Sequence, residues 1–98
     1  MSALLLHPHD NILVVTAAVA PGDAVLINGV PVTIQSRVEV GHKIARHALA
    51  AGDTVVKYGA PIGSMTAPAA LGAHVHLHNM KSDYIATHLR DTLERSMS

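Results

Sequence analysis

The apolar runs of this chain are short, and turn-forming pairs such as Gly-Asp and Asn-Gly separate them. Short apolar runs bounded by such residues are typical of β-strands. Asn28-Gly29 between two of the runs predicts a hairpin with a two-residue type I′ turn. Residues 43–51 fit either a short helix or an irregular strand. The segments that we expect to be strands are 3–7, 11–16, 23–27, 30–34, 54–58 and 73–78.

A loose internal repeat supports the same interpretation. The stretches VAPGDAV (19–25), LAAGDTV (49–55) and AALGAHV (69–75) each place a glycine before the start of an expected strand. Glycine suits a backbone position of positive φ, so the repeat indicates one turn used three times. The unequal intervals between the copies argue against a solenoid. We therefore predict a mainly β fold, a small barrel-like or clip-like domain.

The last part of the chain changes character. Residues 1–80 form the predicted β domain, and residues 81–98 form a predicted amphipathic C-terminal helix or tail. Ser82 is a suitable N-cap, and an apolar stripe follows it at helical spacing. Such a short helix is marginally stable alone, so we expect it to dock on its own domain or on a partner.

Composition argues against several classes of function. Seven Lys and Arg balance seven Asp and Glu, and the chain has no Phe or Trp and only two Tyr. A nucleic-acid or anionic-membrane partner would require a basic surface, and base stacking would require aromatic rings. The absence of cysteine excludes disulfides and Cys-ligated zinc. Together with the lack of a signal-like or membrane-spanning run, this favours a soluble, cytoplasmic protein.

The stretch AHVHLHNM, residues 73–80, places a histidine at every second position. On a β-strand, His74, His76 and His78 would share one face. Two neighbouring imidazoles can converge on one metal ion, whereas three from a regular strand require a bend. The sharper hypothesis is a metal or substrate site with one histidine as acid, base or anion binder. The alternative is the solvent-facing side of an edge strand.

Two other stretches carry candidate groups. VGHKIA (40–45) contains His42 and Lys43, which can also be read as a charged surface turn. KYGAPIGSMT (57–66) has two glycines whose amides can form an anion-binding nest beside Lys57, although a structural turn is the simpler reading. No Ser-His-acid or paired-carboxylate arrangement can be assembled from this chain. We infer that its chemistry is shared with another polypeptide.

Four motifs in order resemble the small N-terminal module of the altronate/galactarate dehydratase family, a SAF domain with a β-clip fold. The family's DN pair matches Asp10-Asn11, and its GHK matches residues 41–43. Its KYGxPIG matches residues 57–63, and its HVHxHN matches residues 74–79. Ala73 departs from the pattern, because an acidic residue usually precedes the first of these histidines.

The resemblance implies the small subunit of a two-subunit, metal-dependent lyase that dehydrates a sugar acid such as altronate. It implies a divalent metal, typically Fe(II), and a large catalytic subunit, without which we expect the chain to be inactive. The implied site residues are His42 and His76 as catalytic groups, Lys43, Lys57 and Asn79 as substrate-binding groups, and His74, His76 and His78 as metal ligands. Isolated, the subunit could self-associate through an apolar face.

Two alternatives remain open. The same type of small subunit occurs in sulfolactate sulfo-lyase, which eliminates sulfite instead of water. A non-catalytic SAF module for carbohydrate binding or assembly is the alternative of a different class.

Overall fold

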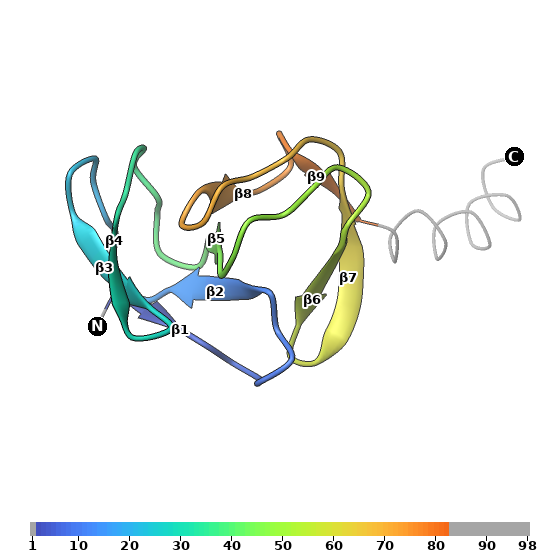
Figure 1. The fold of residues 1–98 in the computed structure, drawn as a ribbon, viewed down its shortest axis with the longest axis horizontal. Helices are drawn as coiled ribbons and strands as arrows, with labels where there is room; N and C mark the ends of the chain where they lie inside the picture. The colour runs from blue at the N-terminus through green and yellow to red at the C-terminus, as the bar shows by residue number, and fades with distance from the viewer. Residues whose placement is uncertain (1, 83–98) are drawn as a thin grey trace, which may run out of the picture.

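The computed structural model describes residues 2–82, and this part of the chain is built from short β-strands with no helix (Figure 1). The mainly β fold predicted from the sequence is confirmed. The strands are β1 Ala3–Leu4, β2 Ile12–Val15, β3 Ala24–Ile27, β4 Val30–Thr33, β5 Lys43–Ala45, β6 Thr54–Lys57, β7 Ala60–Met65, β8 His74–Val75 and β9 Met80–Lys81. All strand pairs are antiparallel.

The strands form three small sheets. A four-stranded sheet of order β1-β2-β5-β8 lies between the β3–β4 hairpin and the three-stranded sheet β6-β7-β9 (Figure 1). Successive residues of a strand point to opposite faces, and the central strands use both faces. From β5, Ile44 packs into one hydrophobic cluster and Ala45 into another. The central sheet therefore separates two aliphatic cores, which explains why short apolar runs suffice.

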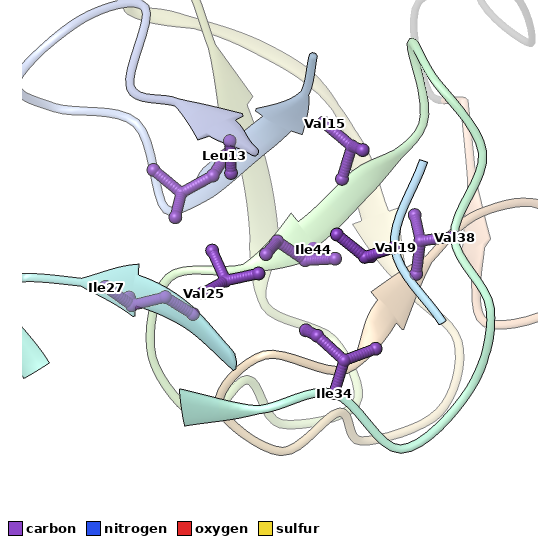
Figure 2. Packing of buried hydrophobic residues seen from close by; sticks show 9 residues of the cluster. Leu13, Val15, Val19, Val25, Ile27, Ile34, Val38 and Ile44 are labelled. Carbon is purple, nitrogen blue, oxygen red and sulfur yellow. The ribbon is translucent and has the colours of Figure 1, made fainter. Parts of the chain in front are cut away.

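The first core lies between the central sheet and the β3–β4 hairpin. Figure 2 shows Leu13, Val15 and Ile44 of the central sheet facing Val25, Ile27 and Ile34 of the hairpin region. The second core collects Ile12, Ala45, Leu49, Val55, Met65, Ala69, Val75 and Met80. Aliphatic side chains fill both cores, and each is closed by one hairpin.

Both hairpins turn over two residues with positive φ. Asn28 and Gly29 have φ values of 53° and 80° and connect the paired residues Ile27 and Val30, so the predicted type I′ turn is confirmed. The β6–β7 hairpin repeats this geometry at Tyr58 and Gly59, with φ values of 55° and 73°. Positive φ is unfavourable for a bulky residue such as tyrosine, which makes this second turn unusual.

The turn repeat seen in the sequence has a fourth copy in the structure. Backbone N–H groups of Asp23, His42, Asp53 and Ala73 each donate to the carbonyl three residues earlier. The glycine before each has a φ between 80° and 94°. Isolated bridges join Val19 to Val38 and Leu49 to Ala69, so the turns associate in pairs. The copy at Val38–His42 was not recognised in the sequence.

Several sequence-based boundaries are corrected. The strand expected over 73–78 ends at Val75, after which the chain turns, and the strand expected over 3–7 ends at Leu4. Residues 43–51 begin as strand β5 and continue as bends and turns, not as a helix.

Strand β7 was missed, because its Pro and Gly residues resemble a loop. Gly63 has a packing reason, since a Cβ there would lie 2.0 Å from the backbone oxygen of Lys81 in β9. Strand β9 therefore pairs with β7 closely, and it includes the first residue of the predicted tail.

The predicted C-terminal helix lies outside the described residues. Within residues 2–82, no helix is long and apolar enough to cross a membrane.

Candidate functional site

Antiparallel pairing of β5 with β8 brings distant histidines together. Ile44 pairs with His74 and Lys43 with Val75, so His42, just before β5, lies beside the residues that end β8. Nδ1 of His42 is 2.9 Å from Nε2 of His74, a hydrogen bond in which one ring donates and the other accepts. The ring centroids of His42 and His76 are 4.4 Å apart and nearly parallel. His42, His74 and His76 thus form one compact cluster, here called the histidine trio.

A turn, not a continuous strand, gathers the histidines. The chain bends at His76, and Asn79 holds this bend from inside. Its Oδ1 accepts a hydrogen bond of 2.9 Å from the backbone N–H of His76, and its Nδ2 donates one of 2.9 Å to the carbonyl of His74. Asn79 is buried, with 7% of its surface exposed. The expected single flat strand face is therefore wrong, and the bend lets two of these imidazoles converge with His42.

The trio has the donor set of a site for a first-row divalent metal. One nitrogen from each ring lies within 4.8 Å of the other two. A metal–nitrogen bond of about 2.0–2.1 Å allows two ligand nitrogens to be at most about 4.2 Å apart, so only slight closure of the rings is needed. Imidazole ligands suit Zn²⁺ and Fe²⁺. The grouping includes His42 in place of the expected His78.

Burial and nearby positive charge lower the pKa of two members of the trio, His74 and His76. Burial lowers the pKa of His74 below its ordinary 6.5, and repulsion from His78, His42, His76 and Lys43 lowers it further. The pKa of His76 is lowered by desolvation and then by His42, Lys43 and His78. Neutral imidazoles have the free lone pair that metal binding or proton abstraction requires.

Lys43 and Lys57 add positive charge, and neither forms an ion pair with a carboxylate among residues 2–82. Lys43 is half-buried, and burial together with repulsion from Lys57 lowers its pKa below 10.5. The ion pair found among residues 2–82 joins Arg37 to Glu39, away from both lysines in sequence. Lys43 acts on both His74 and His76, and Lys57 lies close enough to repel Lys43, so the surroundings of Lys43 are suited to an anion.

Every carboxylate in residues 2–82 is already engaged elsewhere. Asp23 and Asp53 accept hydrogen bonds from the backbone N–H groups of Ala20 and Ala50, and Glu39 pairs with Arg37. Asp10, the most buried carboxylate, accepts hydrogen bonds from the backbone N–H groups of Tyr58 and Gly59. The described part of the chain therefore offers bases and cations at the site, but no acidic side chain.

Asp10 occupies the anion nest that the sequence indicated at residues 57–66. Its two carboxylate oxygens accept hydrogen bonds of 3.0 Å and 2.7 Å from the backbone N–H groups of Tyr58 and Gly59. The Asn11 side chain bonds Thr54 and Val56 of the same hairpin. The nest is therefore structural, and the DN motif clamps the β6–β7 hairpin. From the sequence, Asp10 and Asn11 were matched only to the family's DN pair, with no structural role.

A groove of about 360 Å³ borders the site on one side. His74, His78 and Asn79 line it together with Gln35 and Ser36. The ring of His78 is 5.2 Å from that of His74, so His78 is close to the trio without belonging to it. The predicted site residues thus separate into the trio, the two lysines, and the groove residues His78 and Asn79.

Comparison with known proteins agrees with the motifs. The family profile described as altronate/galactarate dehydratase SAF domain matches residues 1–83. Altronate dehydratase of Escherichia coli (strain K12) is 40% identical over 83 residues, which are 85% of this chain and 17% of that protein. Altronate dehydratase of Bacillus subtilis (strain 168) is 33% identical over 82 residues, 84% of this chain and 16% of that protein.

A shorter relative shares the same region. The alpha subunit of (2R)-sulfolactate sulfo-lyase of Paracoccus pantotrophus is 50% identical over 50 residues, which are 51% of this chain and 75% of that subunit. The chain spans about one sixth of the length of the two altronate dehydratases. The profile match over most of the chain shows that this protein belongs to the altronate/galactarate dehydratase SAF domain family.

Proposed function

We propose that this chain is the small component of a two-component lyase that dehydrates a sugar acid such as altronate. The observation that carries the proposal is the meeting of three imidazoles and the half-buried Lys43 with no available carboxylate among residues 2–82. Such an assembly is half of an acid–base site, and a larger polypeptide supplies the other half. The altronate dehydratases, in which the matched region is a sixth of the chain, support this division.

The dehydration has three chemical steps. The proton on the carbon next to the carboxylate leaves, the hydroxyl on the following carbon departs with a proton as water, and the resulting enol becomes a 2-keto-3-deoxy acid. Lys43 and Lys57 bind the substrate carboxylate, which makes the neighbouring proton more acidic. His42 and His76 can exchange a proton with the substrate, and the lowered pKa of His76 favours its role as a base. The partner's acidic groups complete the transfer.

A divalent metal fits the histidine trio. The three nitrogen donors match what Fe(II) or Zn²⁺ accepts, and Fe(II) is the ion that the family resemblance implies. When bound, the ion supplies positive charge that stabilises the departing oxygen. His78 was expected as a ligand from the sequence, and we now assign it to the groove.

The groove favours a long substrate. Altronate carries a chain of hydroxyl-bearing carbons beyond the reacting pair, whereas sulfolactate has only three carbons. Gln35, Ser36 and His78 offer hydrogen-bonding groups along the groove to such a chain, whereas the Asn79 amide holds the bend instead of binding substrate. The matches to altronate dehydratases also cover more of this sequence than the match to the sulfo-lyase subunit.

A sulfolactate sulfo-lyase is the second candidate, because the Paracoccus pantotrophus alpha subunit has the higher identity over the region that it shares. A non-catalytic SAF module remains the candidate of a different class. It would leave the convergence of the trio and the lysines without a role.

The decisive experiment is co-purification and assay. The chain is co-expressed with a large dehydratase polypeptide of the same organism, and the complex is given altronate or sulfolactate. We expect a 2-keto-3-deoxy acid from altronate, no sulfite from sulfolactate, and no turnover by either component alone. His76→Ala is expected to lower the rate at least about tenfold. Turnover by the large polypeptide alone at the full rate would refute the proposal.

His47→Ala is the matched control for the histidine substitution. His47 is exposed and its ring nitrogen contacts only the neighbouring carbonyl of Ala48. Its substitution is expected to leave the rate unchanged. Calorimetric titration of the isolated chain with Zn²⁺ and, without oxygen, Fe(II) tests the metal assignment independently of activity.

A further inference from the structure

A second groove lies at the end of β5 opposite to the histidine trio. His42 precedes this strand, whereas Arg46 follows it and lines the groove, which has a volume of about 330 Å³. β1 and the β3–β4 hairpin lie side by side at this end of the domain (Figure 1). We call this feature the leucine groove, and its lining residues are Ala3, Leu5, Leu13, Leu26, Asn28, Gly29 and Arg46.

The leucine groove borders the first hydrophobic core. Ala3 and Leu13, which belong to that core, are almost fully buried. Leu5 and Leu26, by contrast, have 37% and 51% of their surface exposed. An apolar side chain placed in the groove would extend the core and remove leucine surface from water.

The two grooves of the domain differ in the side chains that line them. None of the eight exposed large hydrophobic residues in residues 2–82 lines the groove beside the trio, whereas Leu5 and Leu26 both line the leucine groove. The groove beside the trio therefore suits a hydroxylated substrate, and the leucine groove suits an apolar group.

Arg46 forms a polar end of the leucine groove in a fixed orientation. Its Nε donates a hydrogen bond of 3.0 Å to Oδ1 of Asn28, and its Nη1 donates bonds of 2.8 Å and 2.9 Å to the carbonyls of Pro8 and Asp10. All three acceptors are uncharged, and Nη2 donates no hydrogen bond to any of residues 2–82. The described chain thus holds this guanidinium in place without neutralising it.

The leucines and the guanidinium together define the chemistry of a partner. A guanidinium favours a carboxylate, and leucine surface favours an apolar side chain. The carboxylates of residues 2–82 are bonded elsewhere, so a second copy of this part of the chain would bring another arginine and no available acid. A polypeptide segment with an acidic residue beside an apolar one satisfies both requirements.

We propose that the leucine groove is a docking site for the large catalytic polypeptide, which places an apolar side chain between Leu5 and Leu26 and a carboxylate on Nη2 of Arg46. This inference rests on the proposed function, because it takes the large polypeptide from there. The altronate dehydratases support this occupant, since the matched region is about a sixth of each of them. Docking here holds the domain at the end of β5 away from the trio, so the groove serves assembly and not the chemistry.

The variants Leu26→Thr and Arg46→Gln test the docking site. Each is made in the full chain, and the dissociation constant with the large dehydratase polypeptide is measured by biolayer interferometry. We expect each variant to weaken binding at least about tenfold. Added salt is expected to weaken binding by the unsubstituted chain more than binding by Arg46→Gln, which lacks the charge. At saturating concentrations, the turnover rate of each complex is expected to be unchanged, because neither residue belongs to the histidine site.

Leu26→Thr keeps the proposal testable even where Arg46→Gln does not fold, because Leu26 is exposed and threonine is favourable in strands. Tyr58→Asn is the control. It removes a larger exposed side chain from the tip of the other hairpin, outside the leucine groove, at a positive φ that asparagine tolerates. This control is expected to bind as tightly as the unsubstituted chain.

Leu26→Thr that binds unchanged would overturn the docking site, and so would an equal loss of affinity in Tyr58→Asn. Self-association of the unsubstituted chain in sedimentation that Leu26→Thr abolishes would make a second copy the occupant and would also overturn it. A complex that forms through the groove but turns over neither altronate nor sulfolactate would support the docking site and refute the proposed function. An active complex whose groove variants bind unchanged would do the reverse.

Discussion

Two kinds of turn alternate in this domain, and they differ in one side chain. In the turns ending at Asp23 and Asp53, the carboxylate accepts a hydrogen bond of 2.8 Å from the backbone N–H three residues earlier. In the turns ending at His42 and Ala73, the backbone hydrogen bond is the same but the aspartate is absent. The uncapped turns are the two that enter the paired strands β5 and β8 at the histidine site.

The two uncapped turns lack a stabilising side-chain hydrogen bond, and both lead into the strands that carry the histidine site. An aspartate at position 42 would satisfy the turn but would remove one imidazole from the trio. The aspartate that would stabilise the turn and the histidine that belongs to the trio cannot both occupy position 42. Such local conflicts are expected at functional sites. The comparison leads to four predictions.

The largest effect is expected when an uncapped turn is converted into a capped one. His42→Asp restores the side-chain hydrogen bond to the N–H of residue 39 and removes a member of the trio. We expect at least about tenfold weaker binding of Zn²⁺ by the isolated chain, because one of three ligands is lost. Titration calorimetry measures the affinity, and thermal unfolding without metal is expected at an equal or higher temperature. Because a carboxylate can itself bind Zn²⁺, unchanged affinity in His42→Ala is the result that would exclude His42 as a ligand.

Removing a cap gives the opposite result. Asp53→Ala leaves the N–H of Ala50 without its side-chain acceptor and is expected to lower the free energy of unfolding by about 1 kcal/mol. Urea unfolding checks this value, and Asp23→Ala provides the parallel measurement at the other capped turn. Zn²⁺ affinity of the folded chain is expected to stay unchanged. A variant as stable as the original would show that these carboxylates do not stabilise the turns.

Adding a cap at the second uncapped turn is expected to stabilise the domain modestly. Ala73→Asp supplies an acceptor for the N–H of Ala70 and should raise the free energy of unfolding by about 0.5 kcal/mol. The new carboxylate also lies next to His74 in sequence, so it should raise the pKa of that imidazole. NMR titration of the histidine ring protons measures the shift. A lower stability would mean that this turn differs from the capped ones.

The smallest effect is a dependence of stability on pH. Because the pKa values of His74 and His76 are lowered in the folded chain, the unfolded chain binds more protons below the ordinary value of 6.5. The free energy of unfolding should therefore fall as the pH decreases from about 7 towards 5 and should be insensitive to these groups above about 7.

Urea unfolding without metal at several pH values tests this dependence, with the double variant His74→Asn and His76→Asn as control. The groups that oppose protonation are His42, His78 and Lys43. An equally steep decline in the double variant would assign the effect to other groups.

Much of the fold was predictable because its signals are local. The preference of Asn28-Gly29 for a turn of positive φ belongs to these two residues themselves. Glycines before expected strands indicated three of the four repeated turns. Strand β7 was missed because Pro61 and Gly63 are unfavourable in strands, and only the contact of Gly63 with β9 explains it. The copy of the turn at His42 was not recognised, although it keeps the glycine before the strand.

The candidate site was predictable in its residues but not in its grouping. His42, His74 and His76 were all named from the sequence, yet His78 was expected as a ligand and His42 was not. Asp10 was identified from the sequence only as part of the DN pair, whereas in the structure it holds Tyr58 and Gly59, which lie 48 and 49 residues further along the chain.

The sequence by itself determined that this chain forms short strands joined by glycine turns and that histidines and lysines are its candidate site residues. Those properties depend on the backbone preference and the side-chain chemistry of individual residues. Only the tertiary structure decided which histidines meet. His42 reaches His74 across 32 residues because β5 pairs with β8, and the trio closes because buried Asn79 bends the chain after Val75. Pairing between distant strands depends on how two cores close around one sheet, which no single stretch of sequence encodes.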